Sequence, residues 1–174
     1  MARLTIQVMC AMPDRLSTID VQLIDGPVRP IAIDPFPQEC GAECLFIGRT
    51  RGEQHLTQGA LRALQYEAHV GLARQVLGEL ADEAVVRFRA QAVRVHHAVG
   101  VVPVGEASVV VQVACGHRPE SFDACRWLID ELKARAPIWK QEIWSRGGTT
   151  WVGGVAVRPD EFLNHHQKAK GLWT

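Results

Sequence analysis

The chain has 174 residues, a length that suits one domain, and its 47% hydrophobic and 22% charged residues are typical of an ordered globular protein. Lysine and arginine total 19, as do aspartate and glutamate, so the formal net charge is zero. A balanced charge argues against a general nucleic-acid binder, which usually carries a surplus of cations. The balance is uneven, however: residues 1–48 hold three basic and six acidic side chains, so residues 49–174 hold 16 and 13.

The cysteines favour a reducing compartment. An odd number of them, in a chain long enough to bury a core without cross-links, indicates free thiols and therefore the cytoplasm. These are Cys10, Cys40, Cys44, Cys115 and Cys125. The first residues lack the pattern of a signal peptide, and no run approaches the length of a membrane span. We expect a cytoplasmic protein with neither a membrane nor a nucleic acid as partner.

The first part of the chain predicts one strand and a long loop. Residues 1–18 show no clear period, and we treat them as an extension of unknown role before a single domain over residues 19–174. Residues 19–24 alternate apolar and polar side chains, as a half-buried strand does. Three prolines make residues 27–40 mostly loop.

Two further strands follow. The continuous apolar run at residues 44–47 predicts a strand buried on both faces. Residues 60–68 alternate, after the polar loop 48–59. We therefore expect residues 41–50 and 60–68 to pair as an antiparallel hairpin.

The middle of the chain predicts two helices around two strands. Apolar residues recur every four positions from Val70 to Phe88, which indicates an amphipathic helix. Strands are expected at residues 92–99 and 106–115, separated by a turn at 100–105. A second helix should begin near Pro119, because proline is favoured in the first turn. Its expected buried stripe is Phe122, Cys125, Leu128, Ile129 and Leu132.

The last part predicts two short strands and a final helix. Pro137 cannot continue the second helix, and residues 138–144 and 149–152 flank a glycine turn. A short C-terminal helix is expected over residues 159–170. The whole pattern predicts an α+β fold, a mostly antiparallel sheet with two main flanking helices.

Four cationic clusters lie in the positively charged part of the chain. Arg49 and Arg51 occupy a loop, His117-Arg118 stand where a strand gives way to a helix, Lys133 ends that helix, and Lys140 follows the Pro137 break. Arginine and histidine at a helix N-terminus bind phosphate well, and two lysines on either side of a break could converge on one pocket. Solvated surface positions are the alternative explanation for each cluster.

These clusters carry a resemblance to a known family. His117-Arg118, followed after fourteen residues by the run KARAPIWKQE from Lys133 to Glu142, resembles the large, catalytic subunit of molybdopterin synthase, the MoaE family. The segment GAECLFIGRTR from Gly41 to Arg51 is similar to that family's G-A-x-x-x-F-x-G-x-x-R pattern. Residues 64–68 fit the strand before its first helix, and the resemblance covers about residues 19–170.

The resemblance implies an α/β-hammerhead fold and a sulfurtransferase. Such enzymes add two sulfurs to cyclic pyranopterin monophosphate to form the dithiolene of molybdopterin in molybdenum cofactor biosynthesis. The implied partners are a small ubiquitin-like, MoaD-like sulfur carrier with a C-terminal Gly-Gly thiocarboxylate, and a second copy of the chain at the centre of a heterotetramer. The pocket is then expected to use residues of both large subunits, with no cofactor.

The resemblance also implies the site residues. Lys133 and Lys140 are the candidate catalytic residues, one stabilising oxyanions and the other moving protons. The candidate substrate-binding residues include both lysines and are Arg49, Thr50, Arg51, His117, Arg118, Lys133, Lys140, Gln141 and Glu142.

Two other functions stay open on the sequence. A non-catalytic partner-binding module of the same fold is one, and a hydrolase or transferase that uses Cys115 with His117 is the other. We expect no metal site, because Cys40 and Cys44 lack a second close pair and adjacent histidines on a strand point to opposite faces.

Overall fold

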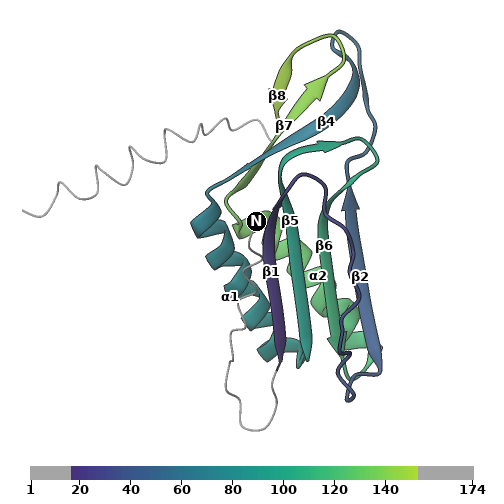
Figure 1. Ribbon diagram of the computed structural model, residues 1–174, viewed down its shortest axis with the longest axis vertical. Helices are drawn as coiled ribbons and strands as arrows, with labels where there is room; N and C mark the ends of the chain where they lie inside the picture. The colour runs from purple at the N-terminus through teal and green to yellow at the C-terminus, as the bar shows by residue number, and fades with distance from the viewer. Residues whose placement is uncertain (1–16, 153–174) are drawn as a thin grey trace, which may run out of the picture.

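The computed structural model describes residues 17–152 and has the predicted α+β architecture (Figure 1). Its sheet has the strand order β2-β6-β5-β4-β7-β8, with β1 added beside β5 and β3 beside β4. Only the β1–β5 pair is parallel among the described strand pairs. The elements are β1 (Thr18–Asp25), β2 (Ala42–Arg49), β3 (Gln54–His55), β4 (Gly59–Ala68), α1 (Val70–Phe88), β5 (Ala92–Pro103), β6 (Ala107–Cys115), α2 (Arg118–Arg135), β7 (Ile138–Trp144) and β8 (Thr149–Trp151).

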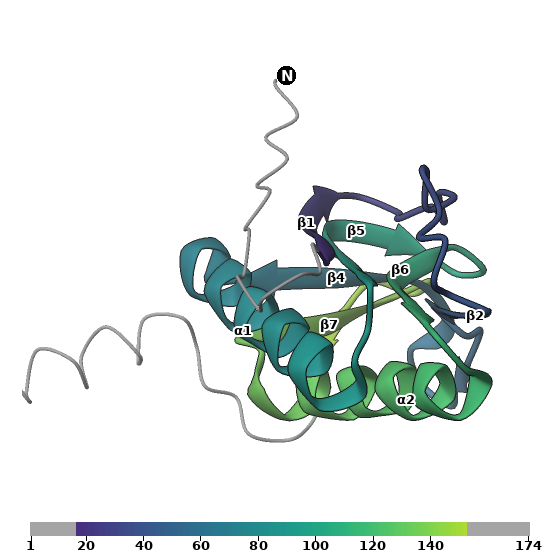
Figure 2. The same ribbon diagram turned by 90° about the horizontal axis from the view of Figure 1, so that it is seen from below.

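The main core lies between one face of the sheet and the two helices. Strands β1, β5, β6 and β2 form this half, and α1 and α2 cover the same face side by side (Figure 2). Alternate residues of β5 and β6 point toward the helices, because side chains alternate along a strand. They meet leucines and alanines that recur along the inner faces of α1 and α2.

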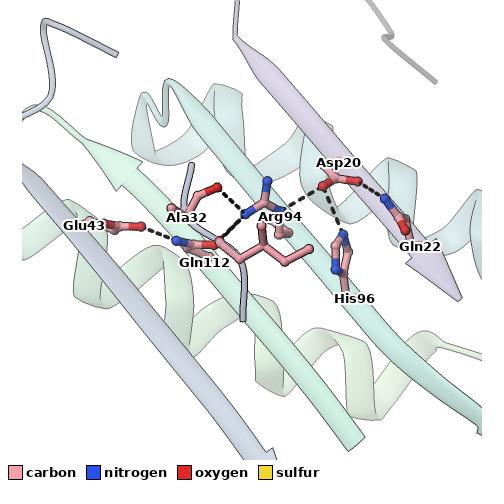
Figure 3. A network of polar contacts seen from close by, with 8 residues as sticks. Asp20, Gln22, Ala32, Glu43, Arg94, His96 and Gln112 are labelled. Carbon is pink, nitrogen blue, oxygen red and sulfur yellow. Dashed lines mark hydrogen bonds and ion pairs between the residues drawn. The ribbon is translucent and has the colours of Figure 1, made fainter. Parts of the chain in front are cut away.

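The other face of this half carries a polar network (Figure 3). The guanidinium group of Arg94 donates to Asp20 Oδ2 at 2.8 Å, to Gln112 Oε1 at 3.0 Å and to the carbonyl oxygen of Ala32 at 3.3 Å. Gln112 in turn donates to Glu43 on β2. The loop before β2 is thereby fixed across the outer face of the sheet.

The second half of the sheet extends away from the helices. The last residues of β5 pair with β4, and β4 pairs with β7, which pairs with β8 (Figure 1). Tyr66 packs against a small apolar cluster on each side of this junction. The β4–β7 half therefore shares core contacts with the main half.

The predicted hairpin between residues 41–50 and 60–68 is wrong. Strand β2 pairs with β6, and β4 pairs with β5 and β7. The predicted burial of residues 44–47 is also wrong, since every residue of β2 is exposed or half-buried. Both errors have one cause: β2 is the edge strand of the sheet, a position that its apolar run does not reveal.

The predicted helix boundaries are confirmed, but not every residue that was expected to be buried in the helices is buried. The first helix spans Val70–Phe88 as expected, and the second begins at Arg118, one residue before the predicted proline. Phe122 was expected in the buried stripe of the second helix but is 60% exposed, and Leu72 on the first helix is 45% exposed. The strand predicted to end at residue 99 continues to Pro103, so the expected turn at 100–105 is shorter.

The remaining predictions concern the ends of the chain. Strands β7 and β8 agree with the predicted pair to within one residue. The expected C-terminal helix at 159–170 and nearly all of the N-terminal extension lie outside the described residues. No helix in the described range is both long enough and apolar enough to span a membrane.

Candidate functional site

Arg49, Thr50 and Arg51 leave the end of β2 beside the turn between β5 and β6. The backbone of Thr50 donates to the carbonyl of Glu106 and accepts from Gly105, at 3.0 and 2.9 Å. Thr50 is buried, whereas the side chains of Arg49 and Arg51 are exposed. Arg49 donates to the Gly105 carbonyl at 3.0 Å, and Arg51 pairs with Glu53 at 2.8 Å. A fixed backbone thus presents two arginines to solvent.

Lys140, Gln141 and Glu142 are consecutive residues of β7. Lys140 is exposed and is the register partner of Tyr66 on β4, so these two side chains leave the same face of the sheet. Gln141 donates to the Thr149 hydroxyl at 2.9 Å. Glu142 lies opposite Leu64 of β4 on one side and Thr150 of β8 on the other.

Lys133 lies in the last turn of α2, just before the chain reverses into β7. The reversal is held by backbone bonds from Ala136 to Leu132 and from His69 to Pro137, at 3.0 and 3.3 Å. His69 also caps α1, because its Nδ1 accepts from the Leu72 amide at 3.2 Å. Lys133 and Lys140 therefore flank a turn that is tied to the junction of β4 and α1.

His117 and Arg118 lie at the other end of α2. His117 is the N-cap residue and Arg118 the first residue of the helix, and both are exposed. The helix dipole favours an anion here, and the two side chains add donors at the same place. The predicted phosphate-binding position is thus present as a helix start with two basic side chains.

The structure brings some predicted residues together and separates others. Arg118 and Lys133 are fifteen residues apart along α2, which is about 22 Å at a rise of about 1.5 Å per residue. Arg49 and Ala42 are at opposite ends of β2, and Ala42 is the register partner of Cys115, close to His117. One copy of the chain therefore holds His117-Arg118 apart from Lys133. It also places Arg49–Arg51 at the end of β2 and Lys140 on β7, two strands that β6, β5 and β4 separate in the sheet.

The thiols do not favour the cysteine-dependent alternative. Burial raises the pKa of the Cys115 thiol to about 11 and that of Cys125 to about 12. Both are therefore protonated at neutral pH, and a thiol is a poor nucleophile compared with a thiolate. The thiols of Cys44, Cys115 and Cys125 are in no disulfide.

Sequence reasoning missed the surroundings of Tyr66. Its ring meets His97 edge-on with centroids 5.2 Å apart, and its hydroxyl is hydrogen-bonded to Ser108. Burial raises the pKa of Tyr66 and lowers that of His97, so both are neutral at pH 7. The sequence places Tyr66 on the correct strand, but its contacts come from β5 and β6 and leave no local signal.

Among residues 17–152 no group of three or more histidine, cysteine or acidic side chains is arranged to hold a metal ion. The titrating and cationic side chains around the site are instead suited to binding an anion and moving protons. The predicted absence of a metal site stays a prediction for the chain as a whole.

Comparisons with known proteins identify relatives of this chain. The family described as MoaE protein matches residues 19–135. The molybdopterin synthase catalytic subunit of Caulobacter vibrioides is 45% identical over 140 residues, which cover 78% of this chain and 90% of that protein. The subunit of the same description from Rattus norvegicus is 34% identical over 126 residues, covering 72% of this chain and 60% of that protein.

Solved structures share the fold. The X-ray structure of molybdopterin synthase from Staphylococcus aureus gives a TM-score of 0.63 at 26% identity, covering 75% of this chain and 96% of that one. The complex of subunits 1 and 2 of the molybdopterin-converting factor from Helicobacter pylori gives 0.62 at 18% identity, covering 78% and 91%. This second likeness supports the fold alone.

Proposed function

The chain belongs to the MoaE family of molybdopterin synthase catalytic subunits, sulfur-transferring enzymes of molybdenum cofactor biosynthesis, and we propose that Lys133 and Lys140 perform its chemistry. The observation that carries this proposal is their placement on either side of the turn between α2 and β7. Both side chains are exposed. Both are therefore available to a substrate.

The substrate we propose is cyclic pyranopterin monophosphate, an anion. Arg49, Arg51, His117 and Arg118 supply charged donors for its phosphate, and such charge-assisted hydrogen bonds are stronger than neutral ones. Thr50 is buried behind the arginines and fixes the backbone that carries them. Gln141 and Glu142 follow Lys140 on β7 and complete the proposed binding residues.

Each lysine has a separate role in the proposed reaction. As the thiocarboxylate sulfur attacks the pterin side chain, negative charge develops on oxygen, and one ammonium group stabilises it. The other lysine transfers a proton as the cyclic phosphate opens. This chain needs no activated thiol of its own, because the partner delivers the sulfur.

We propose that two copies of the chain share each site. The separation of His117-Arg118 from Lys133 along α2 supports this proposal, because a small substrate cannot reach both groups in one copy. The sulfur donor is a small ubiquitin-like, MoaD-like subunit with a C-terminal Gly-Gly thiocarboxylate. The free thiols of Cys44, Cys115 and Cys125 support a cytoplasmic location for the reaction.

The experiment that tests the lysine assignment is reconstitution. Purified protein is mixed with the thiocarboxylated small subunit and cyclic pyranopterin monophosphate, and dithiolene product is measured. Lys133→Ala and Lys140→Ala should each lower the rate by about 100-fold or more, while the variants stay folded and bind the small subunit.

Two controls accompany this experiment. Arg126→Ala removes an exposed cation from α2 and should leave the rate unchanged. Cys115→Ser should also stay active, and its inactivity would restore the thiol mechanism. A wild-type protein that binds the small subunit but forms no product would instead establish the non-catalytic binding module.

A further inference from the structure

Tyr66 lies in the middle of three paired strands close to the candidate site. Its register partners are Gly100 on β5 and Lys140 on β7, because β4 runs between these two strands (Figure 1). Tyr66 and Lys140 are directly opposed in an antiparallel pair, so their Cβ atoms lie about 5 Å apart on the same face. The base of the Lys140 side chain is therefore next to the base of the tyrosine.

The hydroxyl group of Tyr66 reaches the strand end that carries the arginines. It is hydrogen-bonded to Ser108 near the start of β6, and Ser108 is buried. Ser108 follows Ala107, which is the register partner of Arg49 on β2. One side chain thus connects the strand of Lys140 with the end of β2 that presents Arg49.

The ring of Tyr66 is held between these two contacts. His97 meets it edge-on, with ring centroids 5.2 Å apart and planes at 79°. The ring also packs, together with Ile47 of β2, against a small apolar cluster of Val28, Ala98, Val102, Ala107 and Val110. Packing along the ring and a hydrogen bond at its tip fix the distance between β4 and β2, which β5 and β6 separate in the sheet.

The proposed reaction depends on this distance. Arg49 and Arg51 hold the phosphate while Lys140 acts at the reacting atoms of the same small substrate. All three side chains are exposed, so their positions are set by the strands that carry them. Because a displacement of about 1 Å in a reacting group can lower a rate by about 100-fold, the buried groups beneath these strands determine how well the site works.

We propose that Tyr66 is a positioning residue for the sulfur-transfer reaction, whose ring and bond to Ser108 hold Lys140 at the correct distance from Arg49. In this role, which rests on the proposed function of the lysines, Tyr66 acts through Lys140 and contacts neither the substrate nor the reacting atoms. The groups that bind the phosphate stay intact when Tyr66 is changed. The proposal therefore predicts an effect on kcat and little effect on KM.

Removal of the Tyr66–Ser108 bond from either side tests the role. Tyr66→Phe and Ser108→Ala should each lower kcat by about tenfold in the reconstituted reaction, while KM for cyclic pyranopterin monophosphate stays within about twofold. The double variant should be no slower than the slower single variant, because both changes remove the same bond. Circular dichroism gives the folded fraction, to which each rate is normalised.

Ser17→Ala is the matched control. The Ser17 hydroxyl donates to the Ala90 carbonyl at 3.1 Å near the start of β5, whereas Tyr66 pairs near the end of that strand. Its removal should leave kcat and KM unchanged. If Tyr66 had a purely structural role, Tyr66→Phe would lower the folded fraction and leave kcat per folded molecule unchanged. That result would overturn the proposal, as would a double variant slowed by the product of the two single effects.

A cycle with Lys140 shows whether Tyr66 acts through that residue. Tyr66→Phe should cause no further loss when it is added to Lys140→Ala, because the group that it positions is already absent. An equal loss of about tenfold in both backgrounds would place the action of Tyr66 elsewhere and overturn the proposal. Full activity of Lys140→Ala would refute the proposed lysine chemistry itself, whereas a slow Lys140→Ala beside a fully active Tyr66→Phe refutes only the role of Tyr66.

Discussion

At the scale of single residues, Arg94 and Asp20 join distant parts of the chain on the outer face of the sheet. Asp20 accepts from Arg94 and Gln22 and lies 3.0 Å from His96 Nε2. Burial alone would raise the pKa of the Asp20 carboxyl, but these bonds to His96, Arg94 and Gln22 outweigh it and hold the pKa well below its usual value. The ionised carboxylate therefore stabilises the folded protein.

We expect Asp20→Asn to lower the free energy of unfolding at pH 7 by about 2–3 kcal/mol. Since the folded pKa is lower than the unfolded value of about 3.9, this contribution is complete above that value and is lost as the pH falls toward the folded pKa. Urea unfolding at pH 7 and pH 3 checks this expectation. The difference between wild type and variant should shrink at pH 3, and an equal effect from the exposed Asp130→Asn would contradict the assignment.

These contacts had no signal in the sequence. Asp20 and Arg94 are 74 residues apart, whereas Arg94 and Gln112 are register partners on the consecutive strands β5 and β6. The prediction that His96 and His97 point to opposite faces agrees with the structure: His96 contacts Asp20, and His97 contacts the Tyr66 ring. Alternation along a strand is a local property, but the identity of the contacting residues is not.

At the scale of elements, α2 determines where the candidate site residues lie. It begins at Arg118, ends at Arg135, and carries Lys133 in its last turn. Leu128 lies in the middle of its buried face and is 1% exposed. Packing of that face against β6 and α1 fixes both ends of the helix at once.

We expect Leu128→Ala to destabilise the protein by about 3 kcal/mol, because it removes a buried side chain and leaves a cavity. Phe122→Ala on the same helix should cost less than about 0.5 kcal/mol, since that ring is largely exposed. Equilibrium urea unfolding measures both. A large loss of stability from Phe122→Ala would contradict this expectation and indicate that the Phe122 ring is buried.

The two helices were predictable and the strand partners were not. A period of 3.6 residues and a proline in the first turn involve only residues that are close in the sequence. These signals predict both helix positions to within one residue. Strand β2 was expected to pair with β4 because the two are near in sequence, yet it pairs with β6. The choice between such partners depends on how the whole sheet packs against α1 and α2.

At the scale of the whole molecule, the main feature is that His117-Arg118 and Lys133 lie at opposite ends of α2 within one copy. In the proposed shared site, His117 and Arg118 of one copy meet the substrate together with Lys133 and Lys140 of the other. The surplus of cations after residue 48 would then be divided between two symmetric sites, each with residues from both copies.

Mixing two inactive variants tests the shared site. Lys133→Ala and His117→Ala should each be inactive, but a mixed dimer has one site with both residues intact. Random exchange of subunits should therefore restore about a quarter of the wild-type rate. Each variant mixed with itself is the control, and a mixture that stays inactive after proven exchange would show that each copy carries its own complete site.

The sequence by itself determined the class of fold, the two helices, the family and the candidate residues, because periodicity, turn residues and ordered motifs are local in the chain. The tertiary structure decided that β2 is an edge strand, that β4 pairs with β5 and β7, and that Phe122 faces outward. Those properties depend on which strands pair and which faces meet in the core, and such contacts form between residues that the sequence places far apart.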